Sequence, residues 1–237
     1  MIVVVTGASQ GIGATIAEAF AAEANATKGG VRLALLARSR AQLEAVAARG
    51  RARGAEAEAF VCDVTDETAV VQTAEAVRER FGAPDVLVNN AGQFQPGALL
   101  DTDAAAFRQQ VEVNLTSAFL VTHAFLPAMA ARGRGHVFFM ASVASLQAYP
   151  GGAAYCAAKH GLLGLARVVR EETKPLGLRV TTLLPGATFT PSWDGSGLPP
   201  DRLMPPEDIA HAVVDAWRLS DRTVVEELIL RPQLGDL

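Results

Sequence analysis

The sequence predicts an α/β fold, in which helices flank a seven-stranded parallel sheet in a single doubly wound domain. Short runs of Val, Ile and Leu alternate with longer stretches whose apolar residues recur at helical spacing, which is typical of repeated strand, helix, strand units. The apolar runs are nearly continuous, as in parallel strands buried on both faces. A glycine-rich turn between the first run and the first helical stretch fits the same architecture.

These elements follow one another along the whole chain. We expect strands near residues 2–6, 31–36, 57–62, 85–89, 135–140, 178–184 and 224–230, and helices near 11–24, 39–53, 66–81, 103–131, 153–174 and 206–218. Thr65 and Asp66 supply an N-cap for the third helix, and Gly82 ends it. No repeat or linker interrupts the pattern, so residues 1–237 are expected to form one domain.

One long irregular connection separates the sixth strand from the last helix. Residues 185–206, PGATFTPSWDGSGLPPDRLMPP, are rich in proline and glycine. Loops of this length in a compact domain are usually functional lids or disordered segments. This one follows the carboxyl end of a strand, where open α/β sheets bind ligands, and we therefore expect a substrate lid.

Composition and charge narrow the function classes. The net charge of −4 gives no electrostatic footprint for nucleic acid or an anionic membrane. No run reaches the roughly 18 apolar residues of a membrane span, and MIVVV is too short for a signal peptide. Cys62 and Cys156 form no CxxC pair, and the four histidines lack metal-ligand spacing. We expect a cytoplasmic protein with reduced thiols, no metal, and neither nucleic acid nor membrane as a partner.

The first chemical motif is VVVTGASQGIG, with Gly7, Gly11 and Gly13 between the first strand and the first helix. Glycines at these places allow a tight turn, close approach of the backbone to a pyrophosphate, and close contact between helix and strand. The helix N-terminus faces the anion. A P-loop is excluded because Gly-Lys-Ser/Thr is absent, so the motif predicts a dinucleotide-binding Rossmann domain.

A second motif lies in AAYCAAKHGLLGLA, a stretch with helical composition. Tyr155 and Lys159 are four residues apart and share one face of the expected helix. Alone, this pair also fits a tyrosine at the edge of the core and a lysine that extends its stem toward solvent. The surrounding motifs decide between these interpretations.

Those motifs stand in a fixed order along the chain: the glycine turn, NNAG at 89–92, Ser142 thirteen residues before Tyr155, and Pro-Gly at 185–186. With the YxxxK pair, the set resembles the short-chain dehydrogenase/reductase family, along essentially the whole chain. The resemblance implies a single nicotinamide-binding Rossmann domain. It also implies transfer of hydride between NAD(P) and a carbonyl or alcohol carbon.

The resemblance implies a role for each of four catalytic residues. Tyr155 would be the general acid/base, with a pKa that the neighbouring ammonium of Lys159 lowers from about 10. Lys159 would also hold the nicotinamide ribose, and Ser142 would hydrogen-bond the substrate oxygen. Asn114, in VEVNL, would hold the water that links Lys159 to solvent, or else is simply a polar residue on a helix.

Residues after the second strand bear on the choice of cofactor. An acidic residue there would bind the ribose 2′-hydroxyl of NAD, but Ala37 and Arg38 take its place and favour the 2′-phosphate of NADPH, unless Arg38 faces solvent. Ser9 would add a hydroxyl to that phosphate, and Asp63 and Asn90 match family positions at the adenine and after strand four. The residues expected to bind NADP(H) are Gly7, Ser9, Gly11, Ile12, Gly13, Arg38, Ser39, Asp63, Val64, Asn90, Ala91, Gly92, Tyr155, Lys159, Pro185, Gly186, Thr188 and Thr190.

Three stretches narrow the substrate. The connection EANATKGGVRL is longer than usual, and with TFTPSW and the ending PPEDIAHAVVDAWRLSDRTVVEELILRPQLGDL it resembles the sepiapterin reductases and their bacterial relatives. That implies reduction of a diketo side chain on a pterin by NADPH. Relatives with similar endings act on other ketones, so a 3-oxoacyl thioester or a 3-hydroxy acid stays open as the substrate.

The expected substrate contacts are Ser142, Tyr155 and Trp193. Trp193, in the lid, either stacks on a flat heterocycle or caps the pocket with apolar surface. Loops after strands four and five contribute three further candidates, which either form the pocket wall or pack in the core. These are Phe94, Gln147 and Tyr149.

The sequence also bears on two alternative functions and on the oligomeric state. A non-catalytic sensor of the NADP(H) ratio is the alternative of another class, although it would not need the four catalytic residues. A nucleotide-sugar epimerase shares the Tyr/Lys chemistry but has more than the fifty or so residues that follow Pro-Gly here. The apolar content of 103–131 and 153–174 exceeds what one sheet face can cover, which predicts a homodimer or a tetramer of two dimers.

Overall fold

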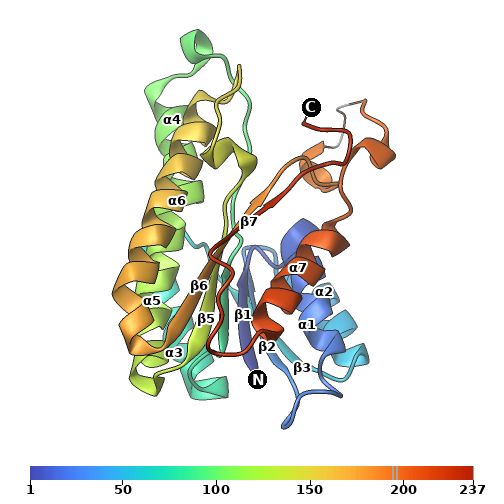
Figure 1. Cartoon of the computed structure of the whole chain (residues 1–237), viewed down its shortest axis with the longest axis vertical. Coiled ribbons are helices and arrows are strands. Elements are labelled where there is room, and N and C mark those ends of the chain that lie inside the picture. The colour runs from blue at the N-terminus through green and yellow to red at the C-terminus, as the bar shows by residue number, and fades with distance from the viewer. Residues whose placement is uncertain (194, 196, 237) are drawn as a thin grey trace.

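Seven parallel strands form one sheet in a computed structural model that describes residues 1–193, 195 and 197–236. The strand order is β3-β2-β1-β4-β5-β6-β7, which confirms the predicted doubly wound α/β fold (Figure 1). The strands are β1 (Ile2–Thr6), β2 (Arg32–Ala37), β3 (Glu56–Val61), β4 (Val86–Asn89), β5 (Gly135–Met140), β6 (Leu178–Pro185) and β7 (Glu227–Leu230).

Helices cover both faces of this sheet (Figure 1). One apolar core joins it to α1 (Gly11–Ala22), α2 (Arg40–Ala52) and α7 (Pro206–Arg218). The other core joins it to α3 (Glu67–Phe81), α5 (Ser117–Arg132) and α6 (Ala153–Thr173), and α4 (Ala104–Val111) packs on α6. Strands between two such layers are buried on both sides, which explains why IVVVT of β1 has no alternation of polar and apolar residues.

The order of the strands fixes where a ligand can bind. Connections run outward from β1 toward β2 and β3, and then from β4 toward β7 in the opposite direction. Loops that leave neighbouring strands β1 and β4 therefore diverge to opposite faces. This divergence opens a crevice beyond the carboxyl ends of the strands, which is the usual ligand site of such sheets.

The largest departures from the expected elements lie in the helix expected at 103–131 and in the last strand. The helix expected at 103–131 contains one π-helical turn, Glu112–Thr116, between α4 and α5. Apolar spacing does not distinguish such a turn from regular helix, because only one extra residue is accommodated. The last strand begins at Glu227, where its register with β6 starts, although Glu226 O still accepts from Thr182 N at 2.9 Å.

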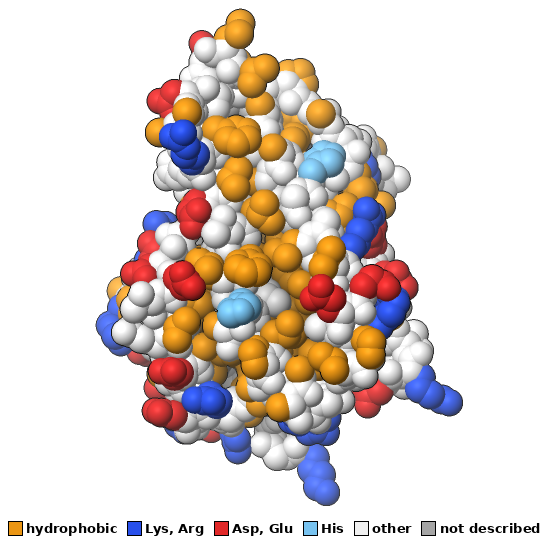
Figure 2. All heavy atoms as spheres, turned by 90° about the vertical axis from the view of Figure 1, so that its left-hand side faces the viewer, with side chains coloured by type: hydrophobic (Ala, Val, Ile, Leu, Met, Phe, Trp, Pro, Cys, Tyr) orange, Lys and Arg blue, Asp and Glu red, His pale blue; other side chains and the backbone are white. Residues whose placement is uncertain are grey.

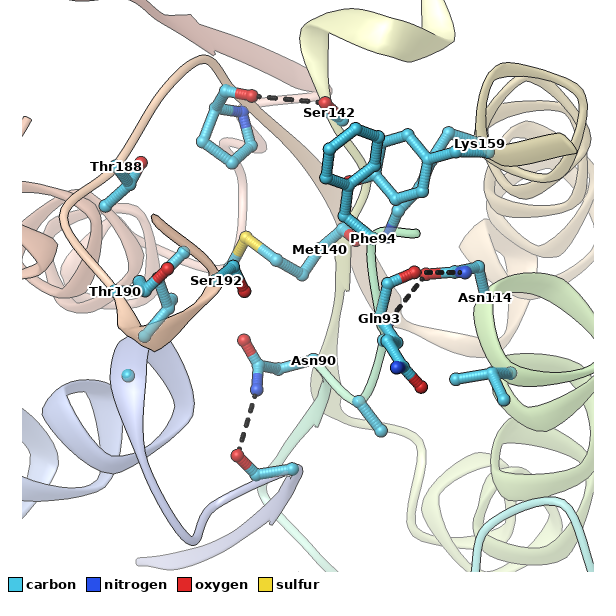
Figure 3. A pocket seen from close by; sticks show the side chains of 18 of the residues that line it. Asn90, Gln93, Phe94, Asn114, Met140, Ser142, Lys159, Thr188, Thr190 and Ser192 are labelled. Atoms are coloured by element: carbon cyan, nitrogen blue, oxygen red, sulfur yellow. Dashed lines mark hydrogen bonds between the residues drawn. The ribbon is translucent and has the colours of Figure 1, made fainter. Parts of the chain in front are cut away.

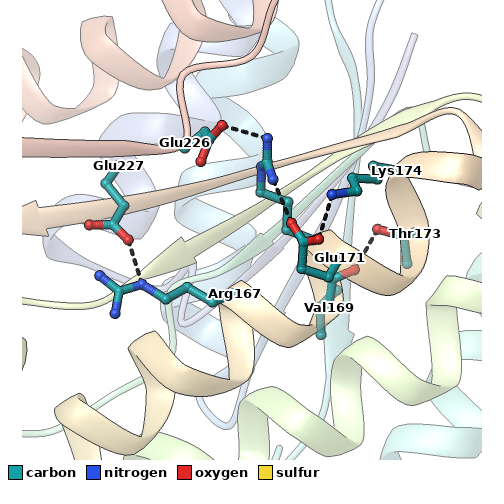
Figure 4. Close-up of polar contacts among 8 residues, drawn as sticks. Arg167, Val169, Glu171, Thr173, Lys174, Glu226 and Glu227 are labelled. Carbon is teal, nitrogen blue, oxygen red and sulfur yellow. Dashed lines mark hydrogen bonds and ion pairs between the residues drawn. The ribbon is translucent and has the colours of Figure 1, made fainter.

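The edge strand β7 is tied to α6 by charged pairs (Figure 4). Arg167 Nε donates to Glu227 at 2.7 Å, and Arg170 forms ion pairs with Glu226 and with Glu171 of its own helix. Each exposed pair contributes well under about 1 kcal/mol. Together they orient the last strand, from which the chain continues toward the crevice.

A buried histidine lies toward the end of the sheet that is opposite the crevice. His136 is fully buried, stacks on Phe138 at 3.9 Å between ring centroids, and shares a 2.7 Å hydrogen bond with the Thr181 hydroxyl. Arg179 donates to the carbonyl oxygens of Trp217 and Leu219, and so caps the end of α7. Burial, with Arg179 nearby, holds the pKa of His136 well below its ordinary range, so this imidazole is neutral.

The helical stretch Ala104–Arg132 is the one described helix that is long and apolar enough to cross a membrane, by length and composition only. Core helices of soluble proteins pass the same test. In this fold α5 contacts α3 and β4 inside one of the two cores, which is the placement of a core helix.

Candidate functional site

A cleft of about 830 Å³ lies at the carboxyl ends of the strands, around the point where the strand order reverses. It is bounded by the glycine turn, the loops after β2 to β5, the start of α6 and the segment after β6. All predicted site residues line this cleft except Gly13. The structure thus brings together residues that are spread over most of the sequence.

The glycine turn leaves backbone exposed at one side of the cleft. Gly7 and Gly11 have φ angles of 63° and 54°, a left-handed conformation that glycine adopts without strain. At Gly13 an added Cβ would lie 2.4 Å from Gly7 O and from Asn90 Nδ2. Gly13 therefore allows α1 to pack closely against the turn, and does not itself face the cleft.

The same turn is locked to the loop after β4 (Figure 3). The Thr6 hydroxyl accepts hydrogen bonds from the backbone N–H groups of Asn90 and Ala91, both at 3.0 Å. Asn90 Nδ2 donates to Thr6 O at 2.9 Å and to Gly7 O at 3.3 Å. The NH₂ group of the Asn90 side chain is thus hydrogen-bonded to the protein backbone, and Asn90 also lines the cleft.

Polar residues gather at the rim beyond β2 and β3. Arg38 is exposed, with Ser39 beside it, and Asp63 lies on the same rim. Hydrogen bonds from the backbone and hydroxyl of Thr65 lower the pKa of Asp63, and the charge of Arg38 adds to this effect. Arg38 is close enough to influence Asp63, so it faces the cleft rim. Among the described residues, its guanidinium forms no ion pair.

Tyr155, Lys159 and Ser142 meet at the centre of the cleft. Lys159 Nζ donates to Met140 O at 2.8 Å, and Ser142 Oγ lies 3.4 Å from Pro185 O (Figure 3). The Ser142 hydroxyl also hydrogen-bonds the phenol of Tyr155. Three elements, β5, α6 and the end of β6, position these groups.

The pKa of the phenol differs from the sequence-based expectation. Burial raises the pKa of Tyr155 to about 12, although the hydrogen bond with Ser142 opposes this rise. Burial also lowers the pKa of Lys159 to about 8. The ammonium lies 5.6 Å from the centroid of the Tyr155 ring, and in this structure desolvation dominates the pKa of the phenol. The expected lowering was therefore wrong here.

Asn114 sits in the π-helical turn between α4 and α5 and is almost completely buried. Its amide accepts from Gln93 N at 3.1 Å and donates to Gln93 O at 2.8 Å (Figure 3). A Cβ at Gly92 would lie 2.8 Å from Asn114 Oδ1 and 3.5 Å from Lys159 Nζ. Asn114 is thus more than a polar residue on a helix surface, because glycine at position 92 lets it approach the centre of the site beside Lys159.

Aromatic side chains form the outer end of the cleft. Phe94 packs edge-on against Tyr155 and Tyr149, with centroid distances of 5.1 and 6.3 Å. Phe94 and Tyr149 each stay 37% exposed, so they form the cleft wall and not a closed core. Trp193 lines the same cleft from the segment after β6.

The segment 185–206 crosses the cleft on a fixed base. Phe189 N donates to Met204 O at 2.8 Å, and Met204 N donates to Ala187 O at 3.0 Å. Thr190 lies against the glycine turn, since a Cβ at Gly11 would be 3.4 Å from its methyl group. Positions 194 and 196, within the predicted lid, lie outside the described residues.

Sequence reasoning missed several residues of the cleft. Gln93, Gln109, Glu112 and Asp236 line it, but no motif marks them. Asp236 belongs to the C-terminal tail, which reaches the outer end of the cleft from β7 (Figure 1). Its contact there joins residues 89 positions apart, which local patterns cannot indicate.

The cleft has the features that a nicotinamide dinucleotide requires. The left-handed glycines at the start of α1 leave room for a pyrophosphate, and Arg38 supplies a cation at one end. Lys159 supplies a buried donor at the other end, beside Tyr155 and Ser142. Within the described residues no cluster of side chains could hold a metal ion.

Comparisons with known proteins agree with this geometry. The family model for short chain dehydrogenases matches residues 1–197. Sepiapterin reductase of Chlorobaculum tepidum is 38% identical over 100% of this chain and 98% of its own. Among solved structures, an alcohol dehydrogenase from Thermococcus sibiricus complexed with 5-hydroxy-NADP has a TM-score of 0.90 at 33% identity, and covers 100% and 98% of the two chains. A variant of actinorhodin polyketide ketoreductase with NADPH has a TM-score of 0.88 at 28% identity, and covers 100% and 97%.

Proposed function

Because the chain belongs to the short-chain dehydrogenase family, we propose that it is an NADPH-dependent oxidoreductase that reduces a carbonyl group of a small molecule. The observation that carries this proposal is the meeting of Tyr155, Lys159, Ser142 and Asn114 in one cleft beside the glycine turn. A protein that only senses NADP(H) would have no use for a buried phenol and ammonium together, since burying both is costly.

The residues of the cleft divide into binding and chemistry. The glycine turn would bind the pyrophosphate, and Lys159 would hold the ribose beside the nicotinamide, which supplies the hydride for the carbonyl carbon. Ser142 holds the substrate oxygen, and Tyr155 donates its proton to that oxygen. A phenol whose pKa is raised to about 12 keeps its proton at neutral pH, as an acid must before it acts. Asn114 fixes the loop at Gly92 and orders the water that returns a proton by way of Lys159.

Arg38 supports NADPH as the preferred cofactor. Its guanidinium is exposed at the cleft rim, and Ala37 before it carries no carboxylate that would repel a phosphate. Ser39 and Ser9 add hydroxyl groups to the same side of the cleft. Relatives of similar fold are solved with NADPH or a derivative of NADP, which agrees with this choice.

For the substrate we propose sepiapterin or a related diketone. Phe94, Tyr149 and Trp193 surround the outer cleft with aromatic surface suited to a flat ring. The identity with a sepiapterin reductase along the full chain supports the same class. A 3-oxoacyl thioester is the second candidate, because the resemblance extends to a polyketide ketoreductase.

The segment 185–206 would act as a lid over the substrate, with a base held by backbone hydrogen bonds. We also propose a homodimer built on α4, α5 and α6. Figure 2 shows apolar side chains gathered over the face that these helices present. Phe107, Phe119 and Val168 contribute to this surface, with exposed fractions of 41%, 48% and 52%. A monomer at micromolar concentration in light scattering would rule this assembly out.

One screen tests the enzymatic proposal. Purified protein is mixed with sepiapterin, an acetoacetyl thioester or a 3-hydroxy acid, and oxidation or reduction of both nicotinamides is followed at 340 nm. We expect NADPH oxidation with sepiapterin or a diketone. Tight NADPH binding with no turnover of any carbonyl compound would instead favour the sensor.

A further inference from the structure

The C-terminal segment closes one side of the substrate end of the cleft. After β7 the chain rises to lie beside the segment 185–206 (Figure 1). Asp236 accepts a 2.9 Å hydrogen bond from Gln147 Nε2, and both residues line the cleft. Arg231 forms an ion pair with the same carboxylate oxygen. Residues 231–236 are called the C-terminal strap.

The strap is held from a second side. The Arg202 guanidinium, in the lid segment, lies 3.4 Å from the carbonyl oxygens of Gly235 and Asp236. A Cβ at Gly186 would lie 3.2 Å from Pro232 and 3.3 Å from Asp236 Oδ1, so the strap packs directly on the start of the lid. The lid segment therefore holds the backbone of the strap, while the Asp236 carboxylate itself contacts Gln147 and Arg231.

The carboxylate determines which end of the Gln147 amide faces the cleft. Paired with arginine, Asp236 offers only acceptor atoms, so the amide turns its NH₂ group toward it. The carbonyl oxygen Oε1 of Gln147 is then free, since no N–H or O–H group within the described residues donates to it. Gln147 thus presents a fixed hydrogen-bond acceptor on the wall of the cleft that Phe94 and Tyr149 also line.

We propose that Asp236 is a positioning residue that holds Gln147 as an acceptor, so that the site selects carbonyl substrates with an N–H or O–H donor at their far end. This inference rests on the proposed function and specifies its substrate class. Arg231 neutralises the carboxylate, so a neutral donor is favoured over a cationic group. A rotated amide would present NH₂ and select the opposite kind of substrate.

Two ketones test the inference with NADPH at saturation. Sepiapterin carries N–H donors on its ring system, whereas 1-phenyl-1,2-propanedione carries no N–H or O–H group. Asp236→Asn frees the amide to rotate and Gln147→Met removes the acceptor. Each should raise KM for sepiapterin about three- to tenfold, the equivalent of one hydrogen bond, and leave kcat within about twofold. KM for the phenyl diketone should stay within about twofold as well.

A double variant separates positioning from direct binding. Because Asp236 acts only through Gln147, Asp236→Asn combined with Gln147→Met should lose no more than Gln147→Met alone. Asp201→Asn, the same change of charge in the lid segment, is the matched control and should leave both KM values unchanged. The Kd for NADPH, measured by fluorescence, should be equal in all of these proteins.

Equal losses for the two ketones, or additive losses in the double variant, would overturn the inference and leave carbonyl reduction standing. A wild type that reduces the phenyl diketone or an acetoacetyl thioester but not sepiapterin would also overturn the inference alone. A wild type that reduces none of the three would refute the proposed function, and the inference with it.

Discussion

Replacing Lys159 by methionine should abolish turnover and yet stabilise the protein without cofactor. Lys159 is 3% exposed, and burial lowers its pKa from an ordinary 10.5 to about 8. At about 1.36 kcal/mol for each pKa unit, holding this ammonium charged at pH 7 costs about 3 kcal/mol of folding free energy. Methionine fills a similar volume without that cost.

The net gain is smaller because one contact is lost. Lys159 Nζ donates to Met140 O at 2.8 Å, and removing this donor costs about 1 kcal/mol. The remaining gain of about 2 kcal/mol should raise Tm by roughly 4 to 8 °C in a chain of this size. Calorimetry or circular dichroism of the purified protein measures this difference, and Lys28→Met, at an exposed loop position, is the control with no expected change.

The dependence on pH gives a sharper test of the same reasoning. A basic group whose pKa is lowered in the folded state reduces the free energy of unfolding by its full amount at pH values below that pKa. The cost disappears as pH rises from about 8 to 10.5, because the folded protein then loses its proton before the unfolded chain does. The Tm advantage of Lys159→Met should therefore shrink across this window. An equal or lower Tm at pH 7, or an advantage that persists at pH 10.5, would refute the argument.

Three other predictions concern separate parts of the molecule. Tyr155→Phe should reduce kcat at least about a hundredfold while the Kd for NADPH, followed by fluorescence, stays nearly unchanged; more than about a tenth of wild-type kcat would contradict the assignment of the acid. Arg38→Ala should raise KM for NADPH and remove most of a tenfold to hundredfold preference over NADH, because a hydrogen bond to a charged group is worth about 1.5 to 3 kcal/mol; equal kcat/KM of wild type with both cofactors would exclude this role. Because of His136, the free energy of unfolding should decrease as pH falls below about 6.5. The imidazole binds a proton in the unfolded chain at this pH, but it stays neutral when it is buried in the folded protein. In His136→Phe that part of the acid sensitivity should disappear from urea unfolding curves, and an unchanged pH dependence would mean that another group is responsible.

The sequence was sufficient for the architecture because its signals are local or periodic. Runs such as IVVVT need two covering layers wherever they occur, and the glycine turn has one structural use between a strand and a helix. The resemblance supplied the positions of Tyr155, Lys159 and Ser142, and the structure brings all three to one cleft. Their roles stay predictions that the experiments above address.

What the sequence could not indicate depends on contacts in space. The π-helical turn at Asn114 leaves the apolar spacing of the helix intact, so only the backbone reveals it. Asp236 meets Gln147 because β7 and the strap return to the cleft, and no short pattern records that path. The direction of the pKa change at Tyr155 follows from burial, which outweighs the hydrogen bond with Ser142, and judging that balance requires coordinates.

The interlock between Thr6, Asn90 and the glycine turn has a consequence for redesign of the enzyme. The contact between α1 and the glycine turn has no spare space, since a single methyl group at Gly13 would collide with both Asn90 and Gly7. Arg38, in contrast, stands exposed at the rim, outside this network. Mutational tolerance should therefore be graded along the cleft. A library randomised around position 38 should exchange one nicotinamide for the other while the residues proposed for proton transfer stay untouched, whereas a library at the interlock should mostly yield misfolded chains.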